Sequence, residues 1–312
     1  MIIQTGQRTD IPAFYSEWFS NRLRDGFVLV RNPFNQTSVT RYELNPNVVD
    51  LIGFCSKNPK PMLKYMELLS PYHQHWFVTI TPYGKDIEPH VPDASSVMET
   101  FKSISRIVGK NCIAWRYDPI IIDREWTIDR HIECFKRMAS TLSGYTNICV
   151  ISFIDLYNKV RRNYPEARSV SMEDQLQLTE AIVHIGARHN MTIKPCGESK
   201  ELESVGADCS GCMTISTFET AIGSHLKAPS NPNNRRECTC YITGDIGQYN
   251  TCGHLCRYCY ANSDAAFVRR NMSAHEPKSP LLIGHLLPND VIHQANQTSW
   301  IDRQMHIEDF LQ

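Results

Sequence analysis

The segment Ile148-Cys149-Val150-Ile151-Ser152-Phe153-Ile154-Asp155 is apolar along almost its whole length and ends in a carboxylate. A strand that is buried on both faces needs such a continuous apolar run, which is typical of parallel sheets covered by helices. Similar runs recur along the chain, with helix-like segments between them. This alternation predicts an α/β protein whose parallel strands are joined by right-handed helical crossovers.

Seven segments are predicted to be strands of this sheet. They span residues 1–5, 49–55, 76–81, 112–117, 148–155, 191–196 and 240–243. Seven strands favour a TIM-like (β/α) barrel or partial barrel over an open sheet, and a chain of 312 residues is long enough for one. Residues 1–200 would form the barrel body. Residues 201–312 would be a cysteine-rich segment that completes the barrel within one structural unit.

Helices are expected between these strands, at residues 10–24, 61–69, 94–108, 128–142, 172–189 and 213–222. Asp10 precedes Pro12 and is predicted to cap the first helix, and Ser171 is predicted to cap the helix at 172–189. Two extended segments, 27–31 and 38–43, predict a hairpin on the barrel. His73 and His75 are interpreted as the start of a strand rather than a metal-binding pair.

Composition limits the classes of partner. The formal net charge is −1, so nothing global attracts the chain to nucleic acid or to anionic lipid. No apolar run approaches the roughly 20 residues that span a bilayer, and no signal peptide is recognisable, so a cytoplasmic protein without a membrane partner is expected. Scattered arginines are interpreted as solvated surface, which makes nucleic acid an unlikely partner; they are Arg161, Arg162, Arg168, Arg235, Arg236, Arg269 and Arg270.

The chain has twelve cysteines, and eight of them fall between residues 196 and 259. In a reducing compartment this concentration favours metal binding over disulfides. The remaining four, Cys55, Cys112, Cys134 and Cys149, stand singly in apolar surroundings and are interpreted as small buried hydrophobic residues.

The stretch Cys252-Gly253-His254-Leu255-Cys256-Arg257-Tyr258-Cys259 can point three thiolates at one centre. Four-iron clusters are held by cysteine thiolates, and a loop that supplies only three leaves one iron open to a ligand. The sequence therefore predicts a [4Fe-4S] cluster on Cys252, Cys256 and Cys259. A zinc site remains open as an alternative, with His254, Cys240 or another donor as the fourth ligand.

Five further cysteines form a possible second metal site. They are Cys196, Cys209, Cys212, Cys238 and Cys240. An auxiliary iron–sulfur cluster, a structural zinc ion or a fourth ligand for the first cluster would each use some of them. Cys212 is the least expected member, because a helix is predicted to begin beside it.

The spacing of the three-cysteine loop, with Tyr258 before its last cysteine, resembles the cluster motif of the radical S-adenosylmethionine (radical SAM) enzymes. That resemblance implies a barrel whose open iron binds S-adenosylmethionine and whose reduced cluster cleaves it to a deoxyadenosyl radical. It also implies an external electron donor. In that superfamily the motif lies near the amino terminus, whereas here it follows most of the barrel, so the order is that of a circularly permuted barrel.

More of the chain resembles family 1848 of the domains of unknown function. The shared pattern comprises the segments Arg8-Thr9-Asp10-Ile11-Pro12-Ala13, Arg31-Asn32-Pro33, Trp115-Arg116-Tyr117-Asp118-Pro119, Asp245-Ile246-Gly247 and the cysteine loop. It extends over essentially the whole length and implies a fold and a cluster rather than a reaction.

Under the permuted order, the first strand would lie beside the strand that leads into the cysteine loop. Gly6, Arg8, Asp10 and Tyr258 are then candidate cofactor-binding residues, although no Gly-Gly-Glu follows the first strand. Active sites of such barrels lie at the carboxyl ends of the strands. Three residues placed there are candidate catalytic residues: Arg116, Asp118 and Lys194.

These observations predict an iron–sulfur protein, and more narrowly a radical-SAM-like enzyme acting on a small-molecule or macromolecular substrate. Two alternatives remain open. One is an iron–sulfur redox or electron-transfer protein that does not use S-adenosylmethionine, and the other is a zinc-binding structural or interaction protein.

Overall fold

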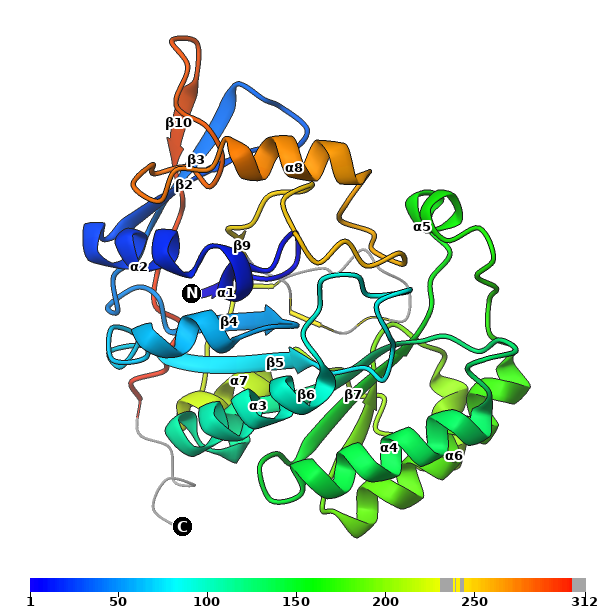
Figure 1. Cartoon of the computed structure of the whole chain (residues 1–312). Helices are drawn as coiled ribbons and strands as arrows, with labels where there is room; N and C mark the ends of the chain where they lie inside the picture. The colour runs from blue at the N-terminus through cyan, green and yellow to red at the C-terminus, as the bar shows by residue number, and fades with distance from the viewer. Residues whose placement is uncertain (231–237, 239, 242–243, 305–312) are drawn as a thin grey trace.

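A computed structural model describes residues 1–230, 238, 240–241 and 244–304 of the chain (Figure 1). Its main element is a seven-stranded sheet in which every pairing is parallel. In spatial order the strands are β8 (Thr192–Pro195), β7 (Ile148–Phe153), β6 (Ile113–Ile120), β5 (His73–Thr79), β4 (Leu51–Ser56), β1 (Ile2–Gln4) and β9 (Gly244–Asp245). The predicted α/β architecture of about seven parallel strands is confirmed.

The sheet is a partial barrel, and no closed barrel forms among the described residues. Its two edges are β8 and β9. The last strand, β9, pairs with the first, β1, through Ile3 opposite Gly244 and Gln4 opposite Asp245. This is the neighbour relation that a permuted order predicts. The strand expected at residues 240–243 is placed too early, since β9 starts at Gly244, and residues 242 and 243 lie outside the described part of the chain.

Helices follow the strands as the alternation predicts. The longest are α3 (Ala94–Val108), α4 (Ile128–Leu142) and α6 (Met172–Arg188), and shorter ones are α5 (Asn158–Asn163), α7 (Ile215–Ile222) and α8 (Ala265–Ser273). The single helix expected at 10–24 is divided at Tyr15 into α1 (Ile11–Phe14) and α2 (Ser16–Asp25). The segment expected to be helical at 61–69 is instead the 3-10 helix η1 (Lys60–Tyr65).

Large aromatic side chains attach the helices to the outer face of the sheet. Phe54 of β4 stacks on Trp76 of β5, with ring centroids 3.9 Å apart, and Phe19 of α2 packs edge-on against Phe54. Trp115 of β6 stacks on Phe135 of α4 at 4.6 Å. Because successive residues of a strand point to opposite faces, the side chains that alternate with these aromatic residues point into the barrel.

The inner face is more polar than the outer one. Cys55 follows Phe54, and Arg116 follows Trp115, so alternation directs both side chains inward. The strand register aligns Gln4 with Asp245 and with Gly53, which adds a carboxylate to this face. The amino end of the interior is filled by α7, whose Phe218 lies 6.5 Å from the His75 ring.

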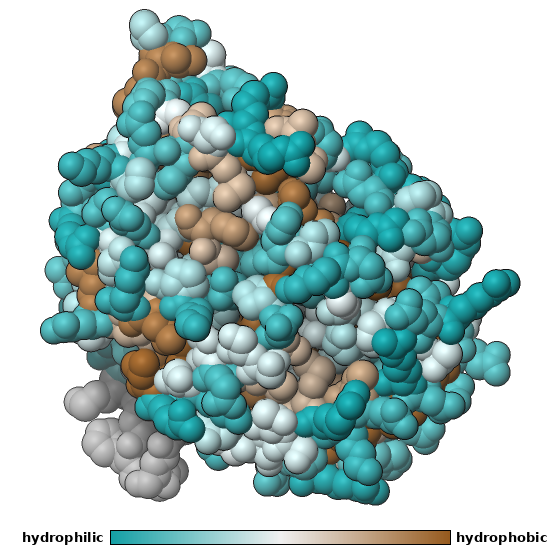
Figure 2. Space-filling model, in the orientation of Figure 1, coloured by the Kyte–Doolittle hydropathy of each residue, from teal (hydrophilic) through white to brown (hydrophobic). Residues whose placement is uncertain are grey.

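A separate three-stranded sheet contains the hairpin expected at 27–31 and 38–43. Strands β2 (Phe27–Arg31) and β3 (Ser38–Glu43) are antiparallel, and β10 (Val291–Gln294) pairs in parallel with β3. The hairpin is confirmed, but it does not belong to the barrel sheet. Hydrophobic side chains are exposed where this sheet projects at the top of the molecule (Figures 1 and 2), among them Phe34, Leu286, Leu287, Val291 and Ile292.

The described residues include no helix with both the length and the apolar composition that crossing a bilayer requires.

His75 is fully buried on the inner face of β5, and neither of its ring nitrogens has a hydrogen-bond partner among the described residues. Its neighbours are the rings of Phe77 and Phe218. Burial lowers the pKa of His75 to about 4. His73, two residues earlier, is the exposed first residue of the same strand, so both histidines lie at the start of β5, as predicted.

The buried His75 predicts a loss of stability in mild acid. An unfolded histidine has a pKa near 6.5. As the pH falls below that value, His75 becomes protonated in the unfolded chain but stays neutral in the folded protein, so the unfolded state is favoured. Between pH 7 and pH 5 this difference should remove about 2 kcal/mol from the free energy of unfolding measured with urea. His75→Phe should abolish this part of the pH dependence, while His73→Phe should leave it intact. Equal pH slopes in wild type and His75→Phe would contradict the assignment.

Candidate metal centres

The three-cysteine loop follows β9 and lies over the carboxyl ends of the neighbouring strands. Hydrogen bonds close its two ends: the Asn250 N–H donates to the Ala261 carbonyl at 3.1 Å, and the Asn262 amide donates to the Cys252 carbonyl at 2.8 Å. Gly253 packs so closely that a Cβ there would lie 2.8 Å from the Phe14 ring. Leu255 has φ +55°, in the left-handed region that side chains rarely adopt. The loop is therefore held in one specific conformation.

Asp10 attaches this loop to the barrel. Its carboxylate caps α1 through the Ala13 N–H at 3.0 Å and accepts hydrogen bonds from Ser56 Oγ at 2.7 Å and the Lys57 N–H at 2.8 Å. His254 Nε2 lies 2.9 Å from the same carboxylate. The predicted helix cap is confirmed, and Asp10 additionally joins the ends of β1 and β4 to the cysteine loop.

The three cysteines of the loop differ in exposure: Cys256 is buried, whereas Cys252 and Cys259 are half-buried. Burial and the nearby Asp10, Cys259 and Cys256 groups raise the pKa of Cys252. Burial also raises the pKa of Cys256, with Lys57 opposing the shift. Burial thus favours the protonated thiols of Cys252 and Cys256, and a metal that bound them would have to displace their protons.

The spacing of the loop sulfur atoms argues against a single ion. Among the described residues, Cys252, Cys256 and Cys259 do not bring their sulfur atoms within 4.8 Å of one another. The two named candidates for a fourth zinc ligand are engaged elsewhere. His254 uses its Nε2 on Asp10 and its Nδ1 on the His90 carbonyl at 3.2 Å, and Cys240 contacts Cys212.

A buried charge network lies beside the loop. The Lys57 ammonium is 2.9 Å from the Glu88 carboxylate, which also accepts hydrogen bonds from Thr81 Oγ1 at 2.7 Å and from the Tyr258 hydroxyl. Burial alone would raise the pKa of Glu88, but Lys57, Tyr258 and Thr81 together hold it below its usual value. Tyr258, a predicted cofactor-binding residue, thus holds the Glu88 carboxylate in place. Glu88 in turn pairs with Lys57, whose charge interacts with the Cys256 thiol.

Lys57 and Glu88 are absent from the residues predicted by sequence. The position of Lys57 two residues after Cys55, at the carboxyl end of a predicted strand, is the signal that would have identified it. Glu88 lies in an irregular loop after β5, where no periodic pattern marks it.

Two other predicted cofactor-binding residues, Arg8 and Gly6, make contacts that stabilise the fold. Arg8 Nε donates to Asp245 Oδ2 at 2.6 Å, which connects the end of β1 to β9. Gly6 lies so close to β4 that an added Cβ would be 2.2 Å from the Cys55 carbonyl oxygen. Close backbone packing accounts for glycine at this position.

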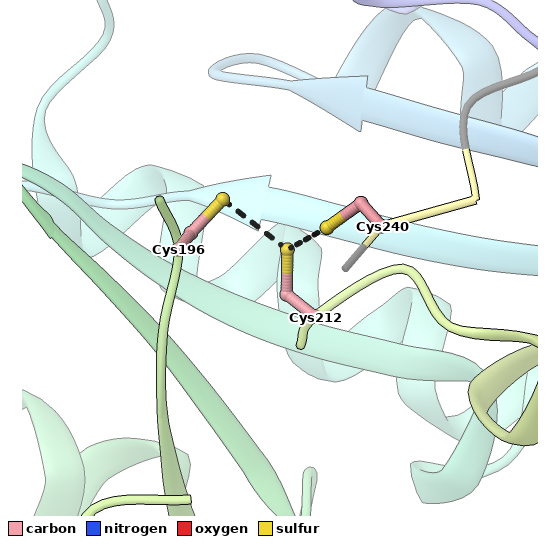
Figure 3. Close-up of side chains that lie close together, drawn as sticks. All are labelled: Cys196, Cys212 and Cys240. Atoms are coloured by element: carbon pink, nitrogen blue, oxygen red, sulfur yellow. Dashed lines mark hydrogen bonds between the residues drawn. The ribbon is translucent and has the colours of Figure 1, made fainter. Parts of the chain in front are cut away.

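The second group of cysteines contains a compact triad. Cys196, Cys212 and Cys240 come from three separate segments, and their sulfur atoms all lie within 4.8 Å of one another (Figure 3). Cys212 Sγ is 3.3 Å from Cys196 Sγ and 3.2 Å from Cys240 Sγ. Three convergent thiols can hold a metal ion. The expectation that Cys212 would be the least important member is wrong, because α7 begins at Ile215 and leaves Cys212 free to turn toward the other two.

The remaining two cysteines of this group line a small cavity beside the triad. Its volume is about 170 Å³. The cysteines in its wall are Cys196, Cys209, Cys238 and Cys240. Hydrogen bonds with Cys196 and Cys212 lower the pKa of Cys240.

The predicted catalytic residues divide between two environments. Arg116 Nε donates to Asp118 Oδ2 at 3.1 Å, and the Arg116 guanidinium interacts electrostatically with the Cys196 and Cys212 thiols. Arg116 and Asp118 therefore lie beside the triad. Lys194 Nζ binds Asp208 Oδ2 at 2.7 Å and Ser210 Oγ at 2.8 Å, which connects β8 to the loop before Cys209.

A larger cavity, of about 690 Å³, opens at the carboxyl end of β7. Its wall includes Asp155, Arg161, Arg168 and Glu198, together with apolar residues such as Phe153. Arg161, Arg162, Arg168, Arg269 and Arg270 are all exposed, as the sequence predicts, and two of them, Arg161 and Arg168, also line this cavity. Arg235 and Arg236 lie outside the described residues.

The segment between β7 and α6 also contacts the cysteine loop. Arg257 forms an ion pair with Glu166, and its guanidinium lies 4.3 Å from the centre of the Tyr164 ring. Asn163 and Arg162 both donate to the Ser263 carbonyl. One wall of the larger cavity is thus joined to the loop that carries Cys252, Cys256 and Cys259.

Fold and site together define an α/β protein with a partial parallel barrel and a buried cysteine cluster that can hold a metal. The chain belongs to the family described as domain of unknown function DUF1848, whose pattern matches residues 2–261 and so includes all eight clustered cysteines. A search of curated proteins and of solved structures finds no match.

The role of Asp10 predicts a specific effect of its removal. Asp10→Ala should lower the free energy of unfolding by about 2–4 kcal/mol, because buried donors of Ser56, Lys57 and His254 lose their acceptor. Asp93 precedes α3 but makes no side-chain capping bond, and its side chain is 83% exposed. Asp93→Ala should therefore change stability by less than about 0.5 kcal/mol. Urea unfolding measures both values, and losses of similar size would contradict the role given to Asp10.

Proposed function

We propose that this protein is an iron–sulfur enzyme whose loop cysteines, Cys252, Cys256 and Cys259, hold a [4Fe-4S] cluster. The observation that carries the proposal is the placement of the loop directly after β9, an edge strand beside β1, at the carboxyl end of a parallel sheet. Active sites of parallel barrels lie at that end. The loop lies there beside the end of β4, with Cys256 buried and Cys252 and Cys259 half-buried.

The fit of a cluster rests on three features of these residues. The three sulfur atoms do not all lie within 4.8 Å of one another, and a four-iron cluster would place each thiolate on a different iron. Burial raises the pKa of Cys252 and Cys256, so their thiolate forms would need a bound cation nearby. The Lys57 ammonium lies near Cys256 and would offset part of the negative charge of a thiolate-bound cluster.

We further propose that the reaction is of the radical-SAM type. When bound and reduced by an external one-electron donor, the cluster would supply the electron that breaks a carbon–sulfur bond of S-adenosylmethionine, releasing methionine and a deoxyadenosyl radical. The pairing of β9 with β1 supports this reaction class, because it gives the sheet the strand order of a barrel in which the cysteine loop follows the first strand.

The residues of this chain would position the reactants and exclude water. Asp10 and His254 fix the loop, while Glu88 holds Lys57 and Tyr258 beside Cys256. Arg116, Asp118 and Lys194 remain candidates for substrate or cofactor contacts. The cavity of about 690 Å³ would accept a small-molecule substrate, and Arg161 and Arg168 in its wall favour one with an anionic group.

A second candidate function is electron transfer or redox sensing by the same cluster without S-adenosylmethionine. The packing at Gly6 favours it, because the close approach of the Cys55 backbone explains the glycine at this position without a bound cofactor. The proposed roles of Gly6 and Arg8 in cofactor binding therefore carry less support than cluster binding by the loop.

Iron analysis tests the cluster. Anoxically purified wild type should contain about four iron and four sulfide per loop and should show a broad visible charge-transfer band. Cys256→Ala should lose this complement, since one of three thiolate ligands is removed. Cys112→Ala is a suitable control, because Cys112 is half-buried, outside both cysteine groups, with its Sγ 3.6 Å from the Ala221 carbonyl oxygen. Wild type that is colourless and carries zinc at the loop would overturn the proposal.

A reaction assay separates the two candidate functions. Reconstituted wild type reduced with dithionite should convert S-adenosylmethionine to 5′-deoxyadenosine and methionine, and Cys256→Ala should not. The products are measured by chromatography and mass spectrometry. A reduced cluster that neither binds nor cleaves S-adenosylmethionine would leave electron transfer as the function of the site.

A further inference from the structure

The cysteine triad lies at the seam of the partial barrel. Cys196 follows β8 directly, and Cys240 lies four positions before β9. These strands are the two edges of the seven-stranded sheet, and no hydrogen-bonded pairing joins them in the part of the chain that the structure describes. Cys212 comes from the connection between them and contacts both other thiols. Through these thiol contacts, the triad connects the segment after β8 with the segment before β9.

We propose that Cys196, Cys212 and Cys240 hold a single thiophilic divalent cation of the zinc class, and that this ion joins the two edges of the barrel. The proposal is independent of the iron–sulfur cluster proposed for the loop. Ion binding would displace the thiol protons into solvent and leave three thiolate ligands.

The distances favour one ion over a cluster. Zinc–sulfur bonds of about 2.3 Å in tetrahedral geometry place neighbouring sulfur atoms roughly 3.8 Å apart. The two measured sulfur–sulfur contacts of the triad are 3.2 and 3.3 Å, and all three atoms lie within 4.8 Å. Small side-chain rotations would therefore give an ion its ligands. A four-iron cluster would need the sulfur atoms farther apart, because each binds a different iron.

A fourth ligand is available in the adjoining cavity. Cys209 and Cys238 line this space of about 170 Å³ together with Cys196 and Cys240. Glu198 also lines it, but its Oε1 already accepts hydrogen bonds from Ser152 Oγ and the Phe153 N–H, both at 2.8 Å. A fourth thiolate, from Cys209 or Cys238, would complete the coordination that is common in structural zinc sites.

Nearby charge suits an anionic metal–thiolate complex. Zinc with four thiolates carries a net charge of about −2. The Arg116 guanidinium points from the inner face of β6 and interacts with both Cys196 and Cys212. Asp118 holds this guanidinium in place through the 3.1 Å contact from Arg116 Nε. A buried cation beside the thiols lowers the cost of keeping them ionised.

Cobalt binding tests the site separately from the loop. In a variant with Cys252, Cys256 and Cys259 all changed to Ala, Co²⁺ should bind with a stoichiometry of one and give the intense visible absorption of tetrahedral cobalt thiolate. Zn²⁺ should displace it. Adding Cys212→Ser to this background should weaken binding at least 100-fold, whereas adding Cys112→Ser should leave it unchanged.

Three results would overturn the single-ion proposal. These are undiminished cobalt binding after Cys212→Ser, binding of iron with sulfide at the triad in preference to zinc, and a disulfide among the three thiols that persists in reductant. Should Cys212→Ser fail to fold, alkylation mapping of the loop-cysteine variant decides instead. Bound Zn²⁺ should protect Cys196, Cys212 and Cys240 from iodoacetamide, and equal labelling with and without Zn²⁺ would exclude the site.

Amide hydrogen exchange tests whether the bound ion joins β8 and β9, the two edge strands of the sheet. Zn²⁺ should slow amide exchange in β8 and β9 by at least tenfold in the loop-cysteine variant, and a chelator should reverse the effect. Exchange in β5, at the centre of the sheet, should not respond. Metal binding without any change in β8 or β9 would refute the joining role.

Discussion

The short pairing between β9 and β1 is the constraint on which the functional region depends. It consists of two residue pairs, Ile3 with Gly244 and Gln4 with Asp245, and the Arg8–Asp245 ion pair adds to it. This contact brings the segment after residue 244 to the carboxyl end of strands formed by the first 200 residues. Without it, the loop cysteines would have no sheet edge beside which to fold, and Asp10 could not reach His254.

Alternation along the strands explains why both cysteine groups lie near one interior. Outward positions hold Phe54, Trp76 and Trp115, which pack on helices, so the residues next to them point inward. Cys55 and Arg116 are placed in this way, and the charge of the Arg116 guanidinium acts on the pKa of both Cys55 and Cys196. A parallel sheet covered by aromatic residues on one side can thus keep charged and sulfur-bearing groups on the other.

The strands and the long helices could be predicted from sequence because each carries a continuous apolar run or a helical period. The helices at 94–108 and 128–142 have the expected bounds. The break at Tyr15 could not be predicted, because it follows from the Tyr15 hydroxyl bonding the Thr251 carbonyl, a contact across 236 positions. Cys212 was undervalued for a similar reason: local helix signals do not show which distant thiols a side chain will meet.

The pairing of the first strand, β1, with the late strand β9 has a consequence for biogenesis. During synthesis, β1 and β4 to β8 leave the ribosome long before residues 244–259 do, and amino-terminal segments generally fold first. The edge of β1 that pairs with β9 must then remain unpaired until β9 has been synthesised. The cysteine loop that follows β9 can therefore take its place only at the end of synthesis, on a sheet whose other strands are already made.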